Sequence, residues 1–238
     1  MPLSKAQIDL LKRVEANYSK GLTSSIASTR RAEAATKDSN GGEGLNTVSP
    51  PLNCPSWVCC LLPCIKHIPS MKLFRQINPE DAEVLREGRW IRYDAASLVK
   101  GDIIRLTEGD VVPADCTLLA LGMDPDRTIS EEDAPKNEEE EEEDMIVDVS
   151  NITGEKKPRT ASLRQDGTVN PIQMFYGGQV LQGSGVAVVT ATGSNTLLAS
   201  LIREGRWPPK GDLSEELGGG GDEDEDLEAG VSLLSSQD

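Results

Sequence analysis

One stretch, MIVDVSNITGEKKP at residues 145–158, combines a strand pattern with a glycine turn. Apolar residues lead into the turn in the manner of a half-buried strand, at Ile146, Val147, Val149 and Ile152. Gly154 can adopt positive φ without steric cost, so we expect Glu155 at the tip of an exposed loop that a strand holds in place. A carboxylate fixed there can orient a water molecule and accept its proton, or it can simply be solvated. By itself, a Thr-Gly-Glu turn predicts only a loop.

Two further blocks of sequence give this turn its context. They are LVKGDIIRLTEGDVVPADCTLLA at residues 98–120 and FYGGQVLQGSGVAVVTATGSNTLLASLI at residues 175–202. The three blocks in this order resemble the actuator domain of the P-type ATPases, pumps that pass through an aspartyl-phosphate. The resemblance covers about half the chain, residues 79–206. The TGExxPxT spacing, at residues 153–160, is most similar to the cation-transporting type II branch.

The resemblance implies both a fold and a set of site residues. The fold is mainly β, a distorted jelly roll (similar to a double-stranded β-helix) with short flanking helices. In the family, the glutamate of the loop positions the water that hydrolyses the aspartyl-phosphate, which makes Glu155 the candidate catalytic residue, with Thr153 and Gly154 shaping the loop. Lys156 stands where the family usually has serine. We expect this lysine to lower the pKa of Glu155 and to pair with it, which would weaken the carboxylate as a base.

Local patterns predict a small twisted β-structure independently of the resemblance. Residues 79–86 have the pattern of a helical turn, and a hairpin is expected around Gly88. Further strands are expected at residues 98–106, interrupted at Gly101-Asp102, and at 116–121, 179–181 and 186–192, with a helix at 196–203.

Three aspartates, Asp102, Asp110 and Asp115, recur in the upstream block and raise the question of a metal site. Asp side chains commonly hold turns by accepting hydrogen bonds from neighbouring amides, and we assign these residues that role and no metal. No nucleotide or other cofactor is predicted either. The 238 residues contain no Asp-Lys-Thr-Gly motif and no Walker-type glycine loop, and Gly183-Ser184-Gly185 lies between strand-like runs rather than before a helix. A pump cycle therefore needs groups from outside this sequence.

The formal charge of −16 is concentrated in two tracts. Residues 131–144 contain ten acids and one lysine (−9), and residues 212–238 contain ten acids and no base (−10), so the rest of the chain carries about +3. We expect an acidic insertion at 124–144 and a disordered acidic tail at 207–238, since neither can bury itself. Nucleic-acid binding is disfavoured, because no basic patch with interleaved aromatic residues occurs.

The first 78 residues fall into three predicted segments. A short amphipathic helix is expected within residues 1–21, where Ser4 and Gln7 have the spacing of a capping box. Residues 22–53 have the composition of a disordered linker. Residues 54–78 contain Cys54, Cys59, Cys60, Cys64 and the only histidine, His67.

Three interpretations of the cysteine segment compete. The spacing of the cysteines and the histidine matches no tetrahedral zinc site. Disulfides need an oxidising compartment, for which the sequence gives no targeting signal. S-acylation of Cys54, Cys59, Cys60 and Cys64, or simple apolar anchoring, is favoured over zinc and would hold the protein at a membrane surface. The apolar run is far shorter than the ~20 residues of a spanning helix.

Two functional hypotheses follow. The first is a non-catalytic module that docks on a P-type cation pump or another protein and regulates it. The second is a split or truncated part of such a pump, in which Glu155 assists aspartyl-phosphate hydrolysis in trans. A folded relic without a partner is the third alternative. The expected location is the cytoplasm, on the cytoplasmic face of a membrane if the cysteines are acylated.

Overall fold

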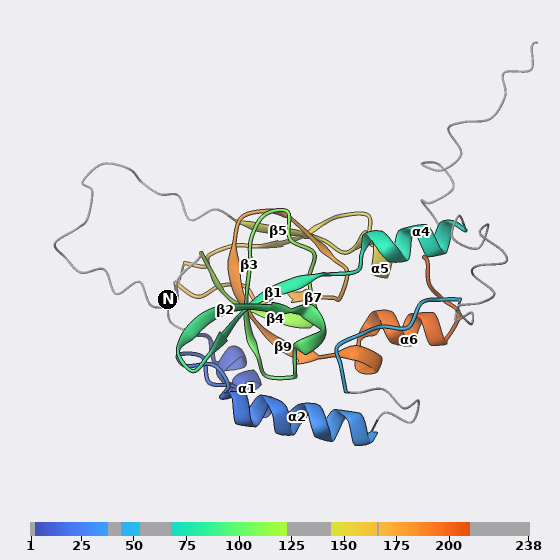
Figure 1. The fold of residues 1–238 in the computed structure, drawn as a ribbon. Coiled ribbons are helices and arrows are strands. Elements are labelled where there is room, and N and C mark those ends of the chain that lie inside the picture. The colour runs from blue at the N-terminus through green and yellow to red at the C-terminus, as the bar shows by residue number, and fades with distance from the viewer. Residues whose placement is uncertain (1–2, 38–43, 53–67, 123–143, 166, 210–238) are drawn as a thin grey trace, which may run out of the picture.

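The computed structural model describes residues 3–37, 44–52, 68–122, 144–165 and 167–209 (Figure 1). Within this part, nine strands form two antiparallel sheets. The six-stranded sheet has the order β2-β1-β3-β9-β4-β7, and the three-stranded sheet has the order β6-β5-β8. The predicted mainly β class is confirmed.

The strands of the larger sheet are β1 (Asp81–Arg86), β2 (Arg89–Asp94), β3 (Ile103–Leu106), β4 (Asp115–Leu121), β7 (Gln173–Met174) and β9 (Gly185–Ala191). Those of the smaller sheet are β5 (Met145–Asp148), β6 (Arg159–Ala161) and β8 (Gln179–Gln182). All seven residues of β4 are buried. The largest apolar cluster draws on both sheets, with Val84 and Leu118 from one and Val147 and Val180 from the other, so the core lies between them.

The β1–β2 hairpin corrects one prediction and confirms another. Residues 79–86 were expected as a helical turn, but residues 81–86 form β1, which pairs with β2 on one side and β3 on the other. Pairing on both edges and burial of Val84 outweigh the local helical pattern. The turn at Glu87 and Gly88 has φ values of 54° and 75°, the positive φ that tight hairpins require, as predicted at Gly88.

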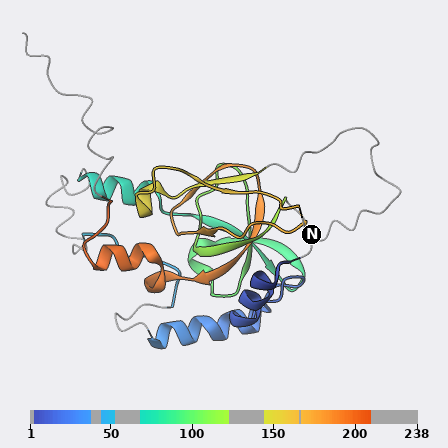
Figure 2. The same cartoon turned by 180° about the vertical axis from the view of Figure 1, so that it is seen from behind.

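Helices cover one side and one end of the β body (Figures 1 and 2). They are α1 (Lys5–Arg13), α2 (Ser24–Lys37), α4 (Pro69–Gln76), α5 (Ser150–Thr153) and α6 (Leu197–Arg203), with 3-10 turns at Ala95–Ser97 and Gly193–Asn195. The capping box of α1 is confirmed, although the helix ends earlier than residue 21. The Gln7 side-chain amide also donates to the backbone oxygens of Leu118 and Leu119, at 3.2 and 2.9 Å, which fixes α1 on β4.

The disordered linker predicted at residues 22–53 is wrong over much of its length, since α2 occupies residues 24–37. Arg30 donates to the carbonyls of Val14 (2.9 Å) and Lys100 (2.6 Å), and Arg31 donates to that of Ser97 (2.8 Å). Asn46, further along, donates to Ala95 O and Pro113 O and accepts from Gly193 N. These tertiary contacts, which composition does not reveal, make this segment part of the domain.

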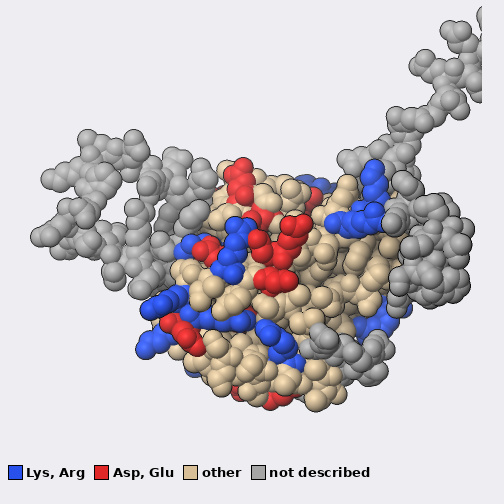
Figure 3. Space-filling model, viewed as in Figure 1, with Lys and Arg blue, Asp and Glu red and all other residues tan. Residues whose placement is uncertain are grey.

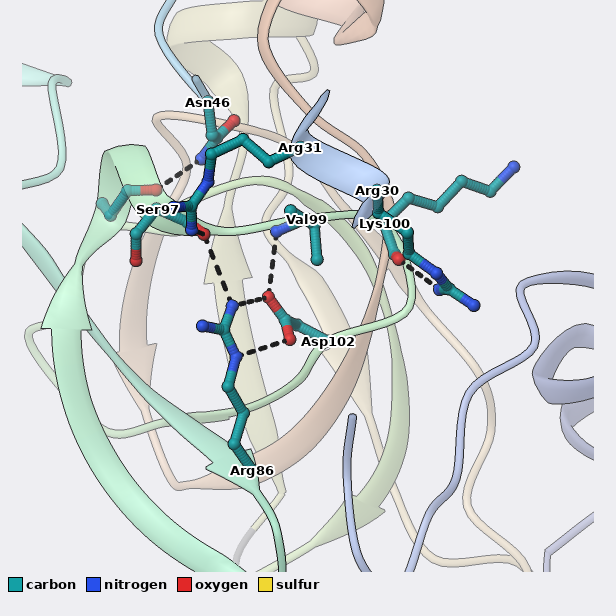
Figure 4. Close-up of polar contacts among 9 residues, drawn as sticks. Arg30, Arg31, Asn46, Arg86, Ser97, Val99, Lys100 and Asp102 are labelled. Carbon is teal, nitrogen blue, oxygen red and sulfur yellow. Dashed lines mark hydrogen bonds and ion pairs between the residues drawn. The ribbon is translucent and has the colours of Figure 1, made fainter. Parts of the chain in front are cut away.

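A buried ion pair joins β1 to the turn before β3 (Figure 4). Arg86 donates from Nε and Nη2 to the two carboxylate oxygens of Asp102, at 3.1 and 2.7 Å. The Asp102 side chain is fully buried and that of Arg86 is 6% exposed. Asp102 also accepts from Val99 N at 2.9 Å, and Asp110 accepts from Thr107 N at 2.7 Å, so both aspartates hold turns as predicted.

Asp115 acts over a longer range than a turn. Its carboxylate accepts from Tyr176 N at 3.0 Å and from Leu197 N, at the start of α6, at 2.7 Å. Burial raises the pKa of Asp115 to about 6, while the two backbone hydrogen bonds act in the opposite direction. This carboxyl group therefore ties β4 to α6. Among the described residues, no group of three or more His, Cys, Asp or Glu side chains could hold a metal ion.

The face seen in Figure 3 mixes charges of both signs, in line with the near-balanced charge outside the acidic tracts. Residues 53–67, with the four cysteines and the histidine of the predicted cysteine segment, lie outside the described residues, as do most of the acidic insertion and the tail from residue 210 onward. The remainder of the cysteine segment is described and contains α4. No helix within the described ranges has the length and apolarity needed to cross a membrane.

The first prediction concerns the buried pair. Asp102→Ala leaves the Arg86 guanidinium buried without its counter-ion, and we expect the free energy of unfolding to fall by about 3–5 kcal/mol. Asp81→Ala is the matched control, because it breaks an exposed pair with Arg92 and is expected to cost about 0–1 kcal/mol. Urea unfolding of both variants measures the difference. Equal losses would contradict the role assigned to Asp102.

Candidate functional site

The loop predicted to carry the site follows β5 directly. Asp148, the last residue of β5, accepts from Ser150 N at 2.8 Å and from Ser150 Oγ at 3.0 Å, which starts the single helical turn α5. Gly154 ends that turn in the left-handed conformation, with φ of 74°, and donates to Ser150 O at 2.8 Å. The leading strand and the positive φ are as predicted, whereas the helical turn between them was not.

Thr153 determines the path of the chain at the turn. Its hydroxyl donates to Val149 O at 3.1 Å and lies 3.4 Å from the amide nitrogen of Glu155, which donates to it. Gly154, Lys156, Lys157 and Pro158 are exposed, so the loop presents itself to solvent. The structure thus brings Thr153, Gly154 and Glu155 together on one exposed turn.

The carboxylate of Glu155 is paired with Arg159, the first residue of β6. Arg159 Nε lies 3.0 Å from Glu155 Oε2, and Arg159 Nη2 lies 2.5 Å from Oε1, a two-pronged contact. The side chains are 39% (Glu155) and 25% (Arg159) exposed. The hydrogen bonds from Arg159 hold the pKa of Glu155 below its ordinary value, against a smaller effect of burial. The expectation that Lys156 is the partner is wrong, because the strand after Pro158 brings Arg159 back to the carboxylate.

Arg159 has two further contacts that do not involve Glu155. Its Nη1 donates to Gln173 O of β7 at 2.6 Å, and its Cζ lies 4.8 Å from the ring centroid of Phe175. A guanidinium over an aromatic face is attracted by the ring electrons. Sequence inspection missed Arg159. The four-residue spacing from Glu155 is the only available signal, and it indicates a pair on a helix rather than across a loop.

The inner side of the loop packs on an apolar cluster at the end of the molecule where α4 and α6 lie. Ile152 of α5 is buried there with Phe74 of α4 and Trp207. The Phe74 and Trp207 rings meet edge to face, with centroids 6.1 Å apart, and Trp207 Nε1 donates to Asn151 O at 2.8 Å. Residues 207–209 were predicted as the start of the acidic tail, but Trp207 is 5% exposed, because it covers the base of the loop.

The site is thus an exposed carboxylate on a supported turn and not a closed pocket. Two hollows within the described residues lie elsewhere. One of about 200 Å³ lies beside Asp81 and Arg92, and one of about 580 Å³ lies between α2 and the end of β9. Such a turn is suited to entering a site on another domain or another protein, where water and reacting groups are supplied.

Comparison with known proteins gives a family match and several partial relatives. The family described as the P-type ATPase actuator domain matches residues 76–128 and 140–205. The chain is 29% identical over 123 residues to a probable plasma membrane ATPase of Dictyostelium discoideum, covering 50% of this chain and 9% of that protein. It is 31% identical over 133 residues to an endoplasmic reticulum calcium ATPase of Aspergillus fumigatus, covering 53% and 12%.

A third relative is the sodium/potassium-transporting ATPase subunit alpha-3 of Rattus norvegicus, 32% identical over 149 residues, which cover 58% of this chain and 12% of that protein. Among solved structures, a zinc-transporting PIB-type ATPase in the E2.Pi state matches with a TM-score of 0.39 and 20% identity, over 61% of this chain and 20% of that one. The matched region thus spans only 9–12% of the length of the three curated relatives.

The second prediction tests the assignment of Arg159. In Arg159→Met, we expect the pKa of Glu155 to rise towards its ordinary value of 4.5, because the lost guanidinium stabilised the charged form. Carbon NMR of the side-chain carboxyl group, followed through an acid titration, measures the shift. The pair stabilises the fold above the ordinary pKa and loses this effect as pH falls through the lowered one.

Lys156→Met is the matched control, since it removes a neighbouring exposed charge and leaves the two-pronged contact intact. We expect the pKa of Glu155 to change little in this variant. A larger change in Lys156→Met than in Arg159→Met would restore Lys156 as the controlling residue.

Proposed function

The chain belongs to the P-type ATPase actuator-domain family, and we propose that it is a binding module that docks its Thr153-Gly154-Glu155 loop on a P-type cation pump and regulates it. The observation that carries this proposal is that the loop has a fixed shape and a carboxylate that is already paired. Its shape is maintained by Thr153, by the left-handed Gly154 and by the apolar cluster beneath, while the Glu155 carboxylate is held by Arg159. A loop in this state is ready to dock but is not free to act as a base.

The pairing of Glu155 decides between docking and hydrolysis in the isolated chain. A general base must reach the proton that it accepts and must have a pKa near the working pH. Both carboxylate oxygens of Glu155 accept hydrogen bonds from Arg159. The pKa of Glu155 is lowered rather than raised. Both facts favour a binding role over proton transfer.

A second candidate function is supported by the relatives, which carry the names of whole pumps. The matched part of the chain corresponds to 9–12% of their length, as expected of a split or truncated part of a cation-transporting ATPase. In that case Glu155 assists the hydrolysis of an aspartyl-phosphate that lies outside these 238 residues. Acting in trans must overcome the entropy loss of association, which disfavours it relative to a covalently joined domain.

The third prediction separates the two. A tagged chain is first used to capture proteins from membranes of its own cells, with mass spectrometry of what co-purifies, and a P-type pump is expected. Recovery of no pump under gentle conditions would contradict docking on a pump. The recovered pump is then phosphorylated, and its dephosphorylation rate is followed with and without the chain.

For a binding module, Glu155→Gln is expected to weaken neither the association nor the effect on the pump by more than about twofold, since the exposed pair contributes little. For hydrolysis in trans, the same variant keeps binding and loses about 100-fold or more of the acceleration. Gly154→Val is the control for loop shape, because a β-branched residue at φ of 74° is strained and its Cβ would lie 3.0 Å from Pro209 Cβ. It is expected to lose binding in both cases.

We also propose that the chain works on the cytoplasmic face of a membrane, held there by acylation of Cys54, Cys59, Cys60 and Cys64. This rests on the clustering of cysteines among apolar residues in the sequence. The fourth prediction is that replacing all four cysteines with serine moves the protein from the membrane fraction to the soluble fraction. An unchanged distribution, or the absence of acyl groups in the mass spectrum of this segment, would rule out the tether.

A further inference from the structure

We infer that Arg159 is a preformed receptor for a phosphoryl oxyanion, and that the Glu155 carboxylate occupies it in the isolated chain. The guanidinium is positioned from two directions by groups other than Glu155. Its Nη1 donates to Gln173 O at 2.6 Å, and the Phe175 ring lies beneath Cζ at 4.8 Å. These contacts persist when Glu155 leaves, so the edge formed by Nε and Nη2 keeps its orientation.

The geometry of that edge suits the proposed ligand. Two parallel N–H groups of arginine match two oxygens of a carboxylate or of a phosphoryl group, and both contacts are strong because donor and acceptor are charged. Glu155 fills the edge with distances of 3.0 and 2.5 Å. A carboxylate in this position is thus a stand-in for an oxyanion from outside.

The pair can exchange its anion because Glu155 is held less firmly than Arg159. Glu155 follows the left-handed Gly154, its side chain is 39% exposed, and its amide contact with Thr153 Oγ1 is long, at 3.4 Å. The carboxylate of Glu155 has a hydrogen bond with the Thr153 side chain, and its other described polar contacts are those with Arg159. Lys156 and Lys157 are exposed and follow Glu155 directly in the sequence, so they add positive charge to the loop, which favours a phosphoryl dianion over a single carboxylate.

The exchange gives the loop a way to sense its target. A phosphoryl group that binds Arg159 displaces the carboxylate of Glu155, so the Glu155 side chain changes its conformation only on a target that carries such a group. Arg159 thereby acts as a positioning residue for Glu155. The identification of the anion as the aspartyl-phosphate of a partner rests on the proposed function, whereas the receptor itself rests on the contacts of Arg159.

The fifth prediction tests the receptor with the full-length chain and inorganic phosphate as the probe. Binding is followed through the Nε–H signal of Arg159 and the side-chain carboxyl carbon of Glu155 in NMR titrations. Phosphate is expected to shift both signals together and to return the pKa of Glu155 towards 4.5 at saturation.

Three variants give the expected pattern. Glu155→Gln removes the resident anion and should bind phosphate about three- to tenfold more tightly, while Arg159→Gln should bind it at least about tenfold more weakly. Arg164→Gln is the matched control, because Arg164 is an exposed arginine that donates to Asn170 Oδ1 at 2.7 Å and has no described contact with Glu155, and its removal should change binding less than twofold. Equal affinities in Arg159→Gln and the unchanged chain, or no gain in Glu155→Gln, would overturn the receptor.

A second arm distinguishes the source of the phosphoryl group. The captured pump is presented once as the phosphoenzyme and once dephosphorylated, and the chain is expected to prefer the phosphoenzyme, with the preference lost in Arg159→Gln. Equal binding to both forms would overturn the assignment to an aspartyl-phosphate. Failure to bind any pump, with phosphate binding still dependent on Arg159, would overturn the proposed function while supporting the receptor.

Discussion

The buried ion pair between Arg86 and Asp102 is the interaction on which the domain's assembly depends most. It joins the hairpin of β1 and β2 to the turn that precedes β3, and Lys100 O in the same turn accepts a hydrogen bond from Arg30 of α2. Two buried charges are stable only when they pair with each other and their remaining polar atoms have hydrogen-bond partners. Asp102 meets this condition, because its carboxylate accepts three hydrogen bonds, two from Arg86 and one from Val99 N. The pair therefore selects one arrangement of hairpin, turn and helix.

Other buried polar groups connect elements in the same manner, and they lead from the core to the loop. Asn46 joins the segment after α2 to the backbone near Pro113 and Gly193. Asp115 fixes the start of α6 against β4, and α6 in turn contributes Leu198 to the apolar cluster that supports Ile152. The position of the Thr153-Gly154-Glu155 turn thus depends on contacts made many residues away, as a rigid presenting surface requires.

Local chemistry explains which features could be predicted from sequence. The strands at residues 116–121, 179–181 and 186–192, the hairpin at Gly88 and the capping box at Ser4 all follow from short-range patterns. The failures arise where distant contacts decide the structure. Residues 24–37 are helical in spite of their Ser and Thr content, since Arg30 and Arg31 donate hydrogen bonds to carbonyls on the β body. Pairing with two neighbouring strands likewise overrides the helical pattern at residues 81–86.

The site shows the same division, and it bears on function. The turn, its glycine and its exposed glutamate could be predicted, but the partner of the glutamate could not, because the contact depends on how β6 returns past the loop. That return changes the chemistry of Glu155. A glutamate beside an exposed lysine remains solvated. Arg159, in contrast, is held in place by Gln173 and Phe175 and binds the carboxylate of Glu155, so any ligand of Glu155 must compete with Arg159. Docking and hydrolysis place opposite demands on this pair, since docking needs only the shape of the loop, and hydrolysis needs the carboxylate released. If an anion binds Arg159 more strongly than Glu155 does, it releases the carboxylate without changing the shape of the loop. Both demands are then met.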